Sequence, residues 1–138
     1  MPKLSGSCLC GAVSYKGEAE PLFAGNCHCT DCRKSSAGGH MALMAVPAPA
    51  VEITGDVKGY EMKADSGATV THHFCPNCGS QMYNTNTNMA GVTVLVATTL
   101  DDPDAFQPQV SVFASRALSW DQPNPATQQF DEMPPMGD

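Results

Sequence analysis

Three cysteines stand within six residues, in the stretch Cys27-His28-Cys29-Thr30-Asp31-Cys32. In an extended backbone Cys27 and Cys29 project to the same side, so three sulfurs from this stretch can reach one metal ion. A four-coordinate zinc ion with three protein ligands keeps one position open for water or substrate, which is the pattern of a catalytic zinc. The spacing therefore predicts a catalytic zinc site made by Cys27, Cys29 and Cys32.

Four further cysteines form two close pairs. In Cys75-Pro76-Asn77-Cys78-Gly79, proline fixes a turn and glycine lets the backbone fold back, so that two sulfurs can face one metal ion. Cys8 and Cys10 make a second pair that shares one face, followed by a turn glycine, Gly11, and then an alternating apolar strand. Closing the long loop between the two pairs costs little, because that cost grows only logarithmically with loop length. We expect Cys8, Cys10, Cys75 and Cys78 to form a closed structural zinc site.

Histidines offer an alternative for the three-cysteine cluster. If His40, His72 or His73 supplied a fourth ligand, the cluster would be a second closed site, and the sequence leaves this alternative open although the spacing favours three ligands. His28 stands between two ligands, so it is expected to face away from the metal and to contact a ligand or the solvent. A histidine that points inward from the strand containing His72 and His73 is more often a hydrogen-bonded core residue.

The chemistry predicted for the open site follows from its charge. Three thiolates make a zinc ion a weak Lewis acid toward water, whereas zinc readily accepts an incoming sulfur ligand, so the site favours activation of a thiol that attacks a small aldehyde. Arg33 and Lys34 follow the third cysteine and are predicted to bind a substrate carboxylate, the alternative being two solvated loop charges. Arg116 and Trp120 are candidates for closing one side of a pocket.

Composition limits the possible partners and compartments. Seven Lys and Arg against fourteen Asp and Glu give a formal charge of -7, which disfavours binding of nucleic acid through phosphate neutralisation. No apolar run approaches the roughly 20 residues of a membrane span. Seven cysteines are an odd number and no signal-peptide core precedes them, so we expect reduced thiols in the cytoplasm and no membrane partner.

Short apolar segments separated by glycine and proline predict the fold class. They favour a mainly β domain of several short antiparallel sheets with little helix. The segment 41–46 is expected to be a buried strand, and 33–39 a tight loop of small residues. We expect one zinc-binding domain over residues 1–120, followed by an extended, proline-rich acidic tail over 121–138 that packs on the same domain.

The cysteine-containing stretches also resemble a known family, the glutathione-dependent formaldehyde-activating (Gfa-like) proteins. The matching stretches are G-S-C-L-C-G-A-V-S-Y at 6–15, C-H-C-T-D-C-R-K at 27–34, F-C-P-N-C-G-S-Q-M-Y at 74–83, V-S-V-F-A-S-R-A-L-S-W at 110–120 and Q-F-D-E-M-P at 129–134. All seven cysteines fall on the family pattern, and their order and spacing together are more specific than any one cluster.

The resemblance implies a mainly β Gfa-like fold with two zinc ions. The residues that match the structural set are Cys8, Cys10, Cys75 and Cys78, and those that match the catalytic set are Cys27, Cys29 and Cys32. The activity it implies is that of a carbon-sulfur lyase or synthase, which condenses a small thiol such as glutathione with formaldehyde to S-hydroxymethylglutathione. The competing interpretations are a non-catalytic zinc-binding interaction module and a metal-free thiol redox sensor.

Overall fold

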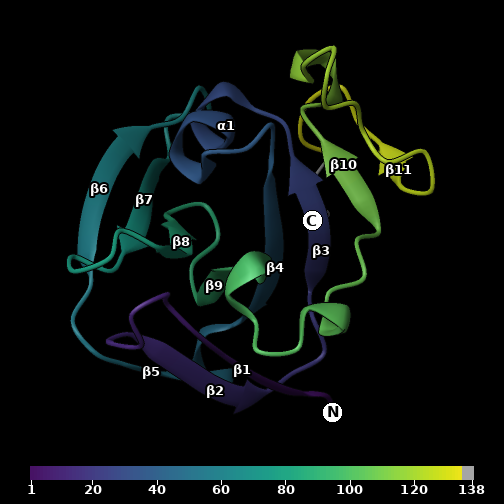
Figure 1. Ribbon diagram of the computed structural model, residues 1–138. Coiled ribbons are helices and arrows are strands. Elements are labelled where there is room, and N and C mark those ends of the chain that lie inside the picture. The colour runs from purple at the N-terminus through teal and green to yellow at the C-terminus, as the bar shows by residue number, and fades with distance from the viewer. Residues whose placement is uncertain (135–138) are drawn as a thin grey trace.

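Two β-sheets and one short α-helix, α1 (Thr30–Ser36), make up the computed structural model, which describes residues 1–134 (Figure 1). The strands are β1 (Lys3–Ser7), β2 (Ser14–Glu18), β3 (Phe23–Cys27), β4 (Met41–Pro47), β5 (Val51–Thr54), β6 (Lys58–Lys63), β7 (Thr69–Phe74), β8 (Gln81–Asn86), β9 (Val92–Val96), β10 (Val110–Val112) and β11 (Gln128–Gln129). Single 3₁₀ turns are η1 (Ala48–Ala50), η2 (Ala97–Thr99), η3 (Pro103–Ala105) and η4 (Ala114–Arg116). The prediction of a mainly β fold with little helix is confirmed.

The strands divide unequally between the two sheets. The small sheet has the order β1-β2-β5, and the large sheet has the order β11-β10-β3-β4-β9-β8-β7-β6. Most pairings are antiparallel, but β10 runs parallel to both β3 and β11. The sequence pattern predicted several short antiparallel sheets, whereas in the structure eight strands form one mixed sheet. In Figure 1 the small sheet lies across one end of the large sheet, and α1 lies at the other end.

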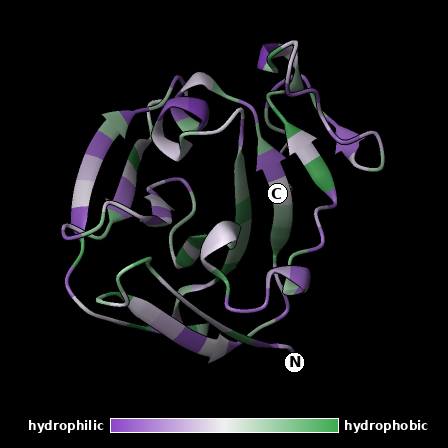
Figure 2. Cartoon of the chain, viewed as in Figure 1, coloured by the Kyte–Doolittle hydropathy of each residue, from purple (hydrophilic) through white to green (hydrophobic). Residues whose placement is uncertain are grey.

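The central strand β4 explains why the protein has two cores. Met44 and Val46 pack into one cluster of buried residues, whereas Met41 and Leu43 pack into another. Because successive side chains of a strand point to opposite faces, the two clusters lie on opposite sides of the large sheet. Burial on both faces gives β4 its nearly continuous apolar sequence, which Figure 2 shows as green along the strand, whereas the edge strand β6 is mostly exposed and hydrophilic.

Helix α1 replaces part of the loop that was expected over 33–39. Cys29 is the N-cap residue, with φ -67° and ψ 160°, and its Sγ accepts a hydrogen bond from the backbone N–H of Cys32 at 3.2 Å. Ala37 ends the helix in the left-handed region with φ 63°. The loop prediction was wrong for the first half of the segment because a cysteine supplied the helix cap that Ser, Thr, Asp or Asn more often provides.

Residues after 120 pack against the large sheet. Strand β11 pairs with β10, and the buried hydroxyl groups of Ser111 and Thr127 form a hydrogen bond of 2.6 Å. Phe130 packs against the core cluster that contains Met41. The extended tail predicted over 121–138 therefore includes a short strand in its described part, and its last four residues, 135–138, lie outside the described residues. No helix within residues 1–134 is long and apolar enough to cross a membrane.

Candidate metal centres

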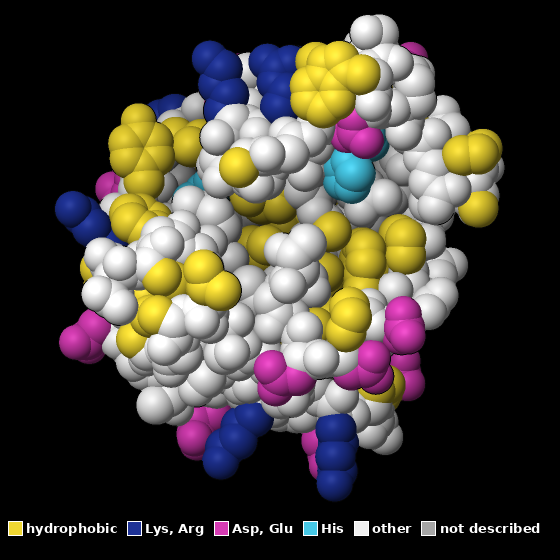
Figure 3. All heavy atoms as spheres, viewed as in Figure 1, with side chains coloured by type: hydrophobic (Ala, Val, Ile, Leu, Met, Phe, Trp, Pro, Cys, Tyr) yellow, Lys and Arg dark blue, Asp and Glu magenta, His cyan; other side chains and the backbone are white. Residues whose placement is uncertain are grey.

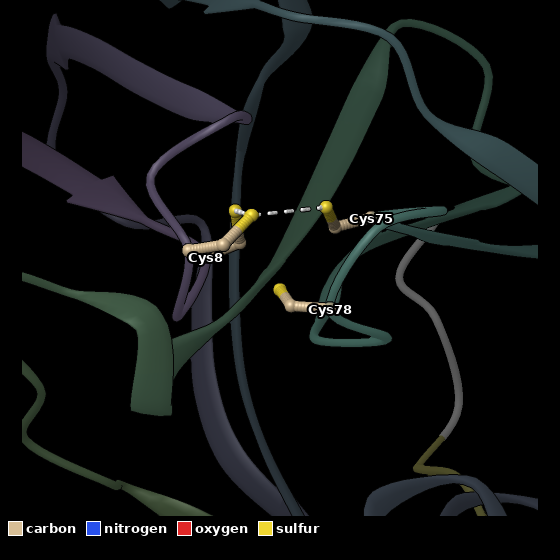
Figure 4. Close-up of side chains that lie close together, drawn as sticks. Cys8, Cys75 and Cys78 are labelled. Atoms are coloured by element: carbon tan, nitrogen blue, oxygen red, sulfur yellow. Dashed lines mark hydrogen bonds between the residues drawn. The ribbon is translucent and has the colours of Figure 1, made fainter.

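Four cysteine sulfurs converge where two turns meet (Figure 4). The Sγ atoms of Cys8, Cys10, Cys75 and Cys78 all lie within 4.8 Å of one another, and the Cys8–Cys10 and Cys10–Cys75 separations are both 3.7 Å. A tetrahedral zinc ion with bonds of about 2.3 Å separates its sulfur ligands by about 3.8 Å, whereas a disulfide requires about 2.05 Å. The donor set and its spacing therefore fit a closed zinc site.

Both turns are shaped for this convergence. Cys8 and Cys10 lie in the turn between β1 and β2, and the backbone N–H of Val13 donates to Cys8 Sγ at 3.2 Å. The chain turns at Gly11, the glycine expected to form a turn after this pair, with φ 83°. In the second turn Gly79 adopts φ 81° and its N–H donates to the carbonyl of Cys75 at 2.8 Å. Positive φ is the conformation that glycine adopts at little cost.

Most of the four-cysteine cluster lies in the core between the two sheets. Cys8 and Cys75 belong to the buried cluster that contains Met44, whereas Cys10 is exposed. The Ser80 hydroxyl lies 3.2 Å from Cys78 Sγ and, by donating a hydrogen bond to the thiolate, lowers the pKa of Cys78 to about 5. A thiolate is the form that binds metal, so this contact favours ligation at neutral pH.

The second cluster comes from one short stretch of chain. Cys27 ends β3, Cys29 caps α1, and Cys32 lies in the first turn of that helix, with the three Sγ atoms within 4.8 Å of one another. In residues 1–134, no histidine or carboxylate joins the three sulfurs within that distance. The arrangement fits a metal ion with three protein ligands and one open position.

Of the histidines considered as fourth ligands, His40 and His73 have side-chain partners elsewhere, whereas His72 lines the same cavity as Cys29. His40 contacts Asp121, with Nδ1 and Oδ2 separated by 2.6 Å, and His73 Nε2 lies 3.0 Å from Thr85 Oγ1. His72 is buried, and burial lowers its pKa. His28 also lies beside His40 and Asp121, and at 1% exposure it is a core residue and makes no surface contact with solvent.

The three thiols of the second cluster differ in acidity. Hydrogen bonds from Cys27 and then from Cys32 lower the pKa of Cys29, even though burial opposes ionisation. The contact with Cys29 raises the pKa of Cys27 to about 12, and the contacts with Cys27 and then with Cys29 raise the pKa of Cys32. Without a metal ion the cluster therefore stabilises one thiolate, at Cys29, and a divalent cation is needed to hold three.

A cavity of about 500 Å³ opens beside Cys29. Its lining includes His72 and Phe113 and two cations, Lys63 and Arg116, with the Arg116 guanidinium 5.1 Å from the centre of the Phe113 ring. The sequence indicated Arg116 as a pocket residue but not Lys63. Lys63 is distant in sequence from every cysteine cluster and belongs to no motif. The structure does not place Arg33, Lys34 or Trp120 in this lining.

Comparison with known proteins gives three findings. Residues 3–116 match the family described as "Glutathione-dependent formaldehyde-activating enzyme". A Schizosaccharomyces pombe protein described as an uncharacterized lyase is 33% identical over 88 residues, which are 64% of this chain and 61% of the yeast protein, so the chain matches less than two thirds of that relative. The crystal structure of a Rhodobacter sphaeroides protein has a TM-score of 0.56 at 21% identity, covering 73% of this chain and 93% of that one, which supports the fold alone.

Proposed function

The chain belongs to the glutathione-dependent formaldehyde-activating enzyme family, and from this membership we propose that it is a zinc-dependent carbon-sulfur lyase or synthase acting on a small thiol and a small aldehyde. Glutathione is the leading thiol and formaldehyde the leading aldehyde, which would make the product S-hydroxymethylglutathione. The lyase name of the yeast relative supports the reaction class. The single observation that carries the proposal is the three-sulfur cluster, with no fourth protein ligand in residues 1–134, beside a cavity.

The proposed roles of the cysteines follow from the two clusters. Cys8, Cys10, Cys75 and Cys78 would hold a structural zinc ion, and Cys27, Cys29 and Cys32 a catalytic one. A zinc ion held by Cys27, Cys29 and Cys32 would supply an open coordination position that accepts sulfur and favours ionisation of a thiol. In the synthetic direction the sulfur-carbon bond forms, the carbonyl π bond opens, and the thiol proton ends on the new hydroxyl oxygen; the lyase direction reverses each change.

The cations near the open cluster suit a thiol that carries carboxylates. Lys63 and Arg116 line the cavity beside Cys29, where the lining also holds the acidic residues Asp31, Asp65 and Glu132. The Arg116 guanidinium lies 3.7 Å from the exposed Asp65 carboxylate, which a substrate carboxylate would replace as its partner. We propose Lys63 and Arg116 as substrate-binding residues, together with Arg33 and Lys34 on α1, which follow the third ligand directly. The cavity volume of about 500 Å³ is within the usual range for small-molecule sites.

The proposal includes a cytoplasmic location and excludes nucleic acid and membranes as partners. All seven cysteines are free thiols in the structure, and zinc-thiolate clusters persist where thiols stay reduced. The negative formal charge disfavours polyanion binding.

Calorimetric titration of zinc-loaded protein with glutathione tests the proposal directly. We expect binding that is lost in Cys27→Ser with the fold intact, that weakens in Arg33→Ala and in Arg116→Ala, and that is unchanged in the control His73→Gln, which lies outside the cavity lining. Exchange spectroscopy of a glutathione and formaldehyde mixture should show faster interconversion with the adduct when enzyme is added. If protein that carries both metal ions binds none of several thiols at millimolar concentration, the lyase or synthase proposal is wrong and the chain is better interpreted as a non-catalytic zinc-binding interaction module.

A further inference from the structure

A third group of possible metal ligands shares no residue with either cysteine cluster, although His28 stands between Cys27 and Cys29 in the sequence. It consists of His28, His40 and Asp121, whose donor atoms all lie within 4.8 Å of one another. Asp121 Oδ2 is 2.6 Å from His40 Nδ1 and 3.9 Å from His28 Nδ1, and the two imidazole rings are 4.9 Å apart between centroids. The three side chains therefore point toward one common position from segments that are far apart in the sequence.

His28 is the residue that requires an explanation. Its side chain is 1% exposed, and neither ring nitrogen has a hydrogen-bond partner among residues 1–134. The large majority of buried polar groups in proteins are satisfied, because an unpaired group loses its hydration without compensation. The Asp121 carboxylate is hydrogen-bonded to His40, and at 3.9 Å from His28 Nδ1 it is too distant for a direct hydrogen bond to that ring. An ion between the three side chains would satisfy one of the two ring nitrogens of His28.

The fold holds the three residues in place. The backbone N–H of His28 donates to the carbonyl of Val112 at 3.0 Å, and the Ser36 hydroxyl donates to the carbonyl of His40 at 3.1 Å. The Asp121 carboxylate lies directly against Gly39, where the Cβ of any other residue would overlap it. The donors are therefore fixed by a strand end, a helix end and a close backbone contact before any ion binds.

We infer that His28, His40 and Asp121 form a third metal-binding site, selective for a divalent first-row transition metal ion. Two imidazole nitrogens and one carboxylate oxygen are donors that ions such as nickel and zinc accept, and this set differs from the all-sulfur clusters. The His40 and Asp121 side chains are 32% and 25% exposed, so an ion can enter from solvent and complete its coordination with water. In Figure 3 a histidine and an acidic side chain adjoin at the surface, above a band of hydrophobic side chains.

Nickel binding to untagged protein tests this inference independently of catalysis. The metal content of the purified protein is measured first, and the protein is then dialysed against nickel ions and analysed again for all metals. We expect one equivalent of nickel beyond the metal already present, without loss of zinc. Paramagnetic nickel should also shift or broaden the ring signals of His28 and His40 in the wild-type protein, while those of His73 change little.

Variants locate the additional equivalent. Asp121→Asn and His40→Gln should each weaken nickel binding by at least about 100-fold, since even changes to residues that only support a ligand cost 10–100-fold. His73→Gln is the matched control and should bind nickel as the wild type does. No additional equivalent in the wild type, an additional equivalent that persists in folded Asp121→Asn or His40→Gln, or paramagnetic effects that miss His28 and His40 would each show that the group is only a His40–Asp121 ion pair beside a buried histidine.

Discussion

The two cysteine clusters differ in what they connect. The four-cysteine cluster takes its ligands from the β1–β2 turn and the β7–β8 turn, so it joins the small sheet to the large sheet. The three-cysteine cluster takes all its ligands from the end of β3 and the start of α1, a single stretch of six residues. A metal ion that links distant segments contributes its binding energy to folding, whereas one held by a local segment can leave while the fold remains.

The two cysteine clusters also differ in which core buries them. The first belongs to the core between the sheets, where Cys75 is fully buried, and the second belongs to the core on the other face, with Cys29 reaching a cavity. The small sheet is also attached without metal, through a hydrogen bond of 2.8 Å between the hydroxyl groups of Tyr15 and Thr99 and a bridge between Gly6 and Leu100. The comparison therefore predicts a stability difference that mutation can measure.

The largest expected effect is the loss of folding when the four-cysteine cluster loses a ligand. Cys78→Ser should abolish the cooperative thermal transition or lower its midpoint by at least about 15 °C, because a structural zinc ion contributes directly to folding. Cys29→Ser should move the midpoint by less than about 5 °C, since serine can still cap α1. Circular dichroism melting of both purified variants measures the difference. Equal destabilisation by the two substitutions would show that both clusters are structural.

A chelator should remove the two proposed metal ions one after the other, because the two sites hold them with different strength. A chelator is expected to remove the metal of the three-cysteine cluster first, because that site has fewer ligands and opens onto a cavity. Elemental analysis should fall from two zinc ions to one per chain while three thiols, and not seven, become titratable. Simultaneous release of all thiols would contradict the proposed difference between the sites.

Cysteine alkylation after selective chelation should show the asymmetry within the open cluster. The lowered pKa of Cys29 keeps it a thiolate across the neutral range, so its alkylation rate should stay nearly constant between pH 6 and 8. An ordinary thiol with a pKa of 9.0 would react roughly 100-fold faster over that interval, because its thiolate fraction rises tenfold per pH unit. Cys27, whose pKa is raised to about 12, should remain unmodified. Mass spectrometry of the peptides distinguishes the sites, and preferential modification of Cys27 would contradict the assignment.

The smallest expected effect concerns the cations near the open site. Arg116→Gln should raise the KM for a thiol substrate by about five- to tenfold with little change in kcat, the size expected when one hydrogen bond of about 1 to 1.4 kcal/mol is lost. Arg33→Gln should have a smaller effect, because Arg33 is not in the cavity lining. Both variants should keep the wild-type zinc content. A larger effect from Arg33 would place the substrate carboxylate over α1.

Local chemistry explains which features the sequence could predict. The turn Cys75-Pro76-Asn77-Cys78-Gly79 and the stretch 27–32 each place their sulfurs together through neighbouring backbone geometry, so the spacings in the sequence indicated both cysteine clusters. Alternating and continuous apolar segments likewise predicted strands such as β4. For these features the interactions that form the structure lie within a few residues of one another.

Only the tertiary structure decided which distant side chains meet. Asp121 is 81 positions from His40, and Arg116 is 87 positions from Cys29, so neither the third ligand group nor the cavity cations leave a local pattern. Their proximity depends on the parallel pairing of β10 with β3 and on the packing of residues after 120 against the sheet. The physical reason is that spacing along the chain determines the geometry of a turn, whereas strand register and core packing determine which segments lie side by side.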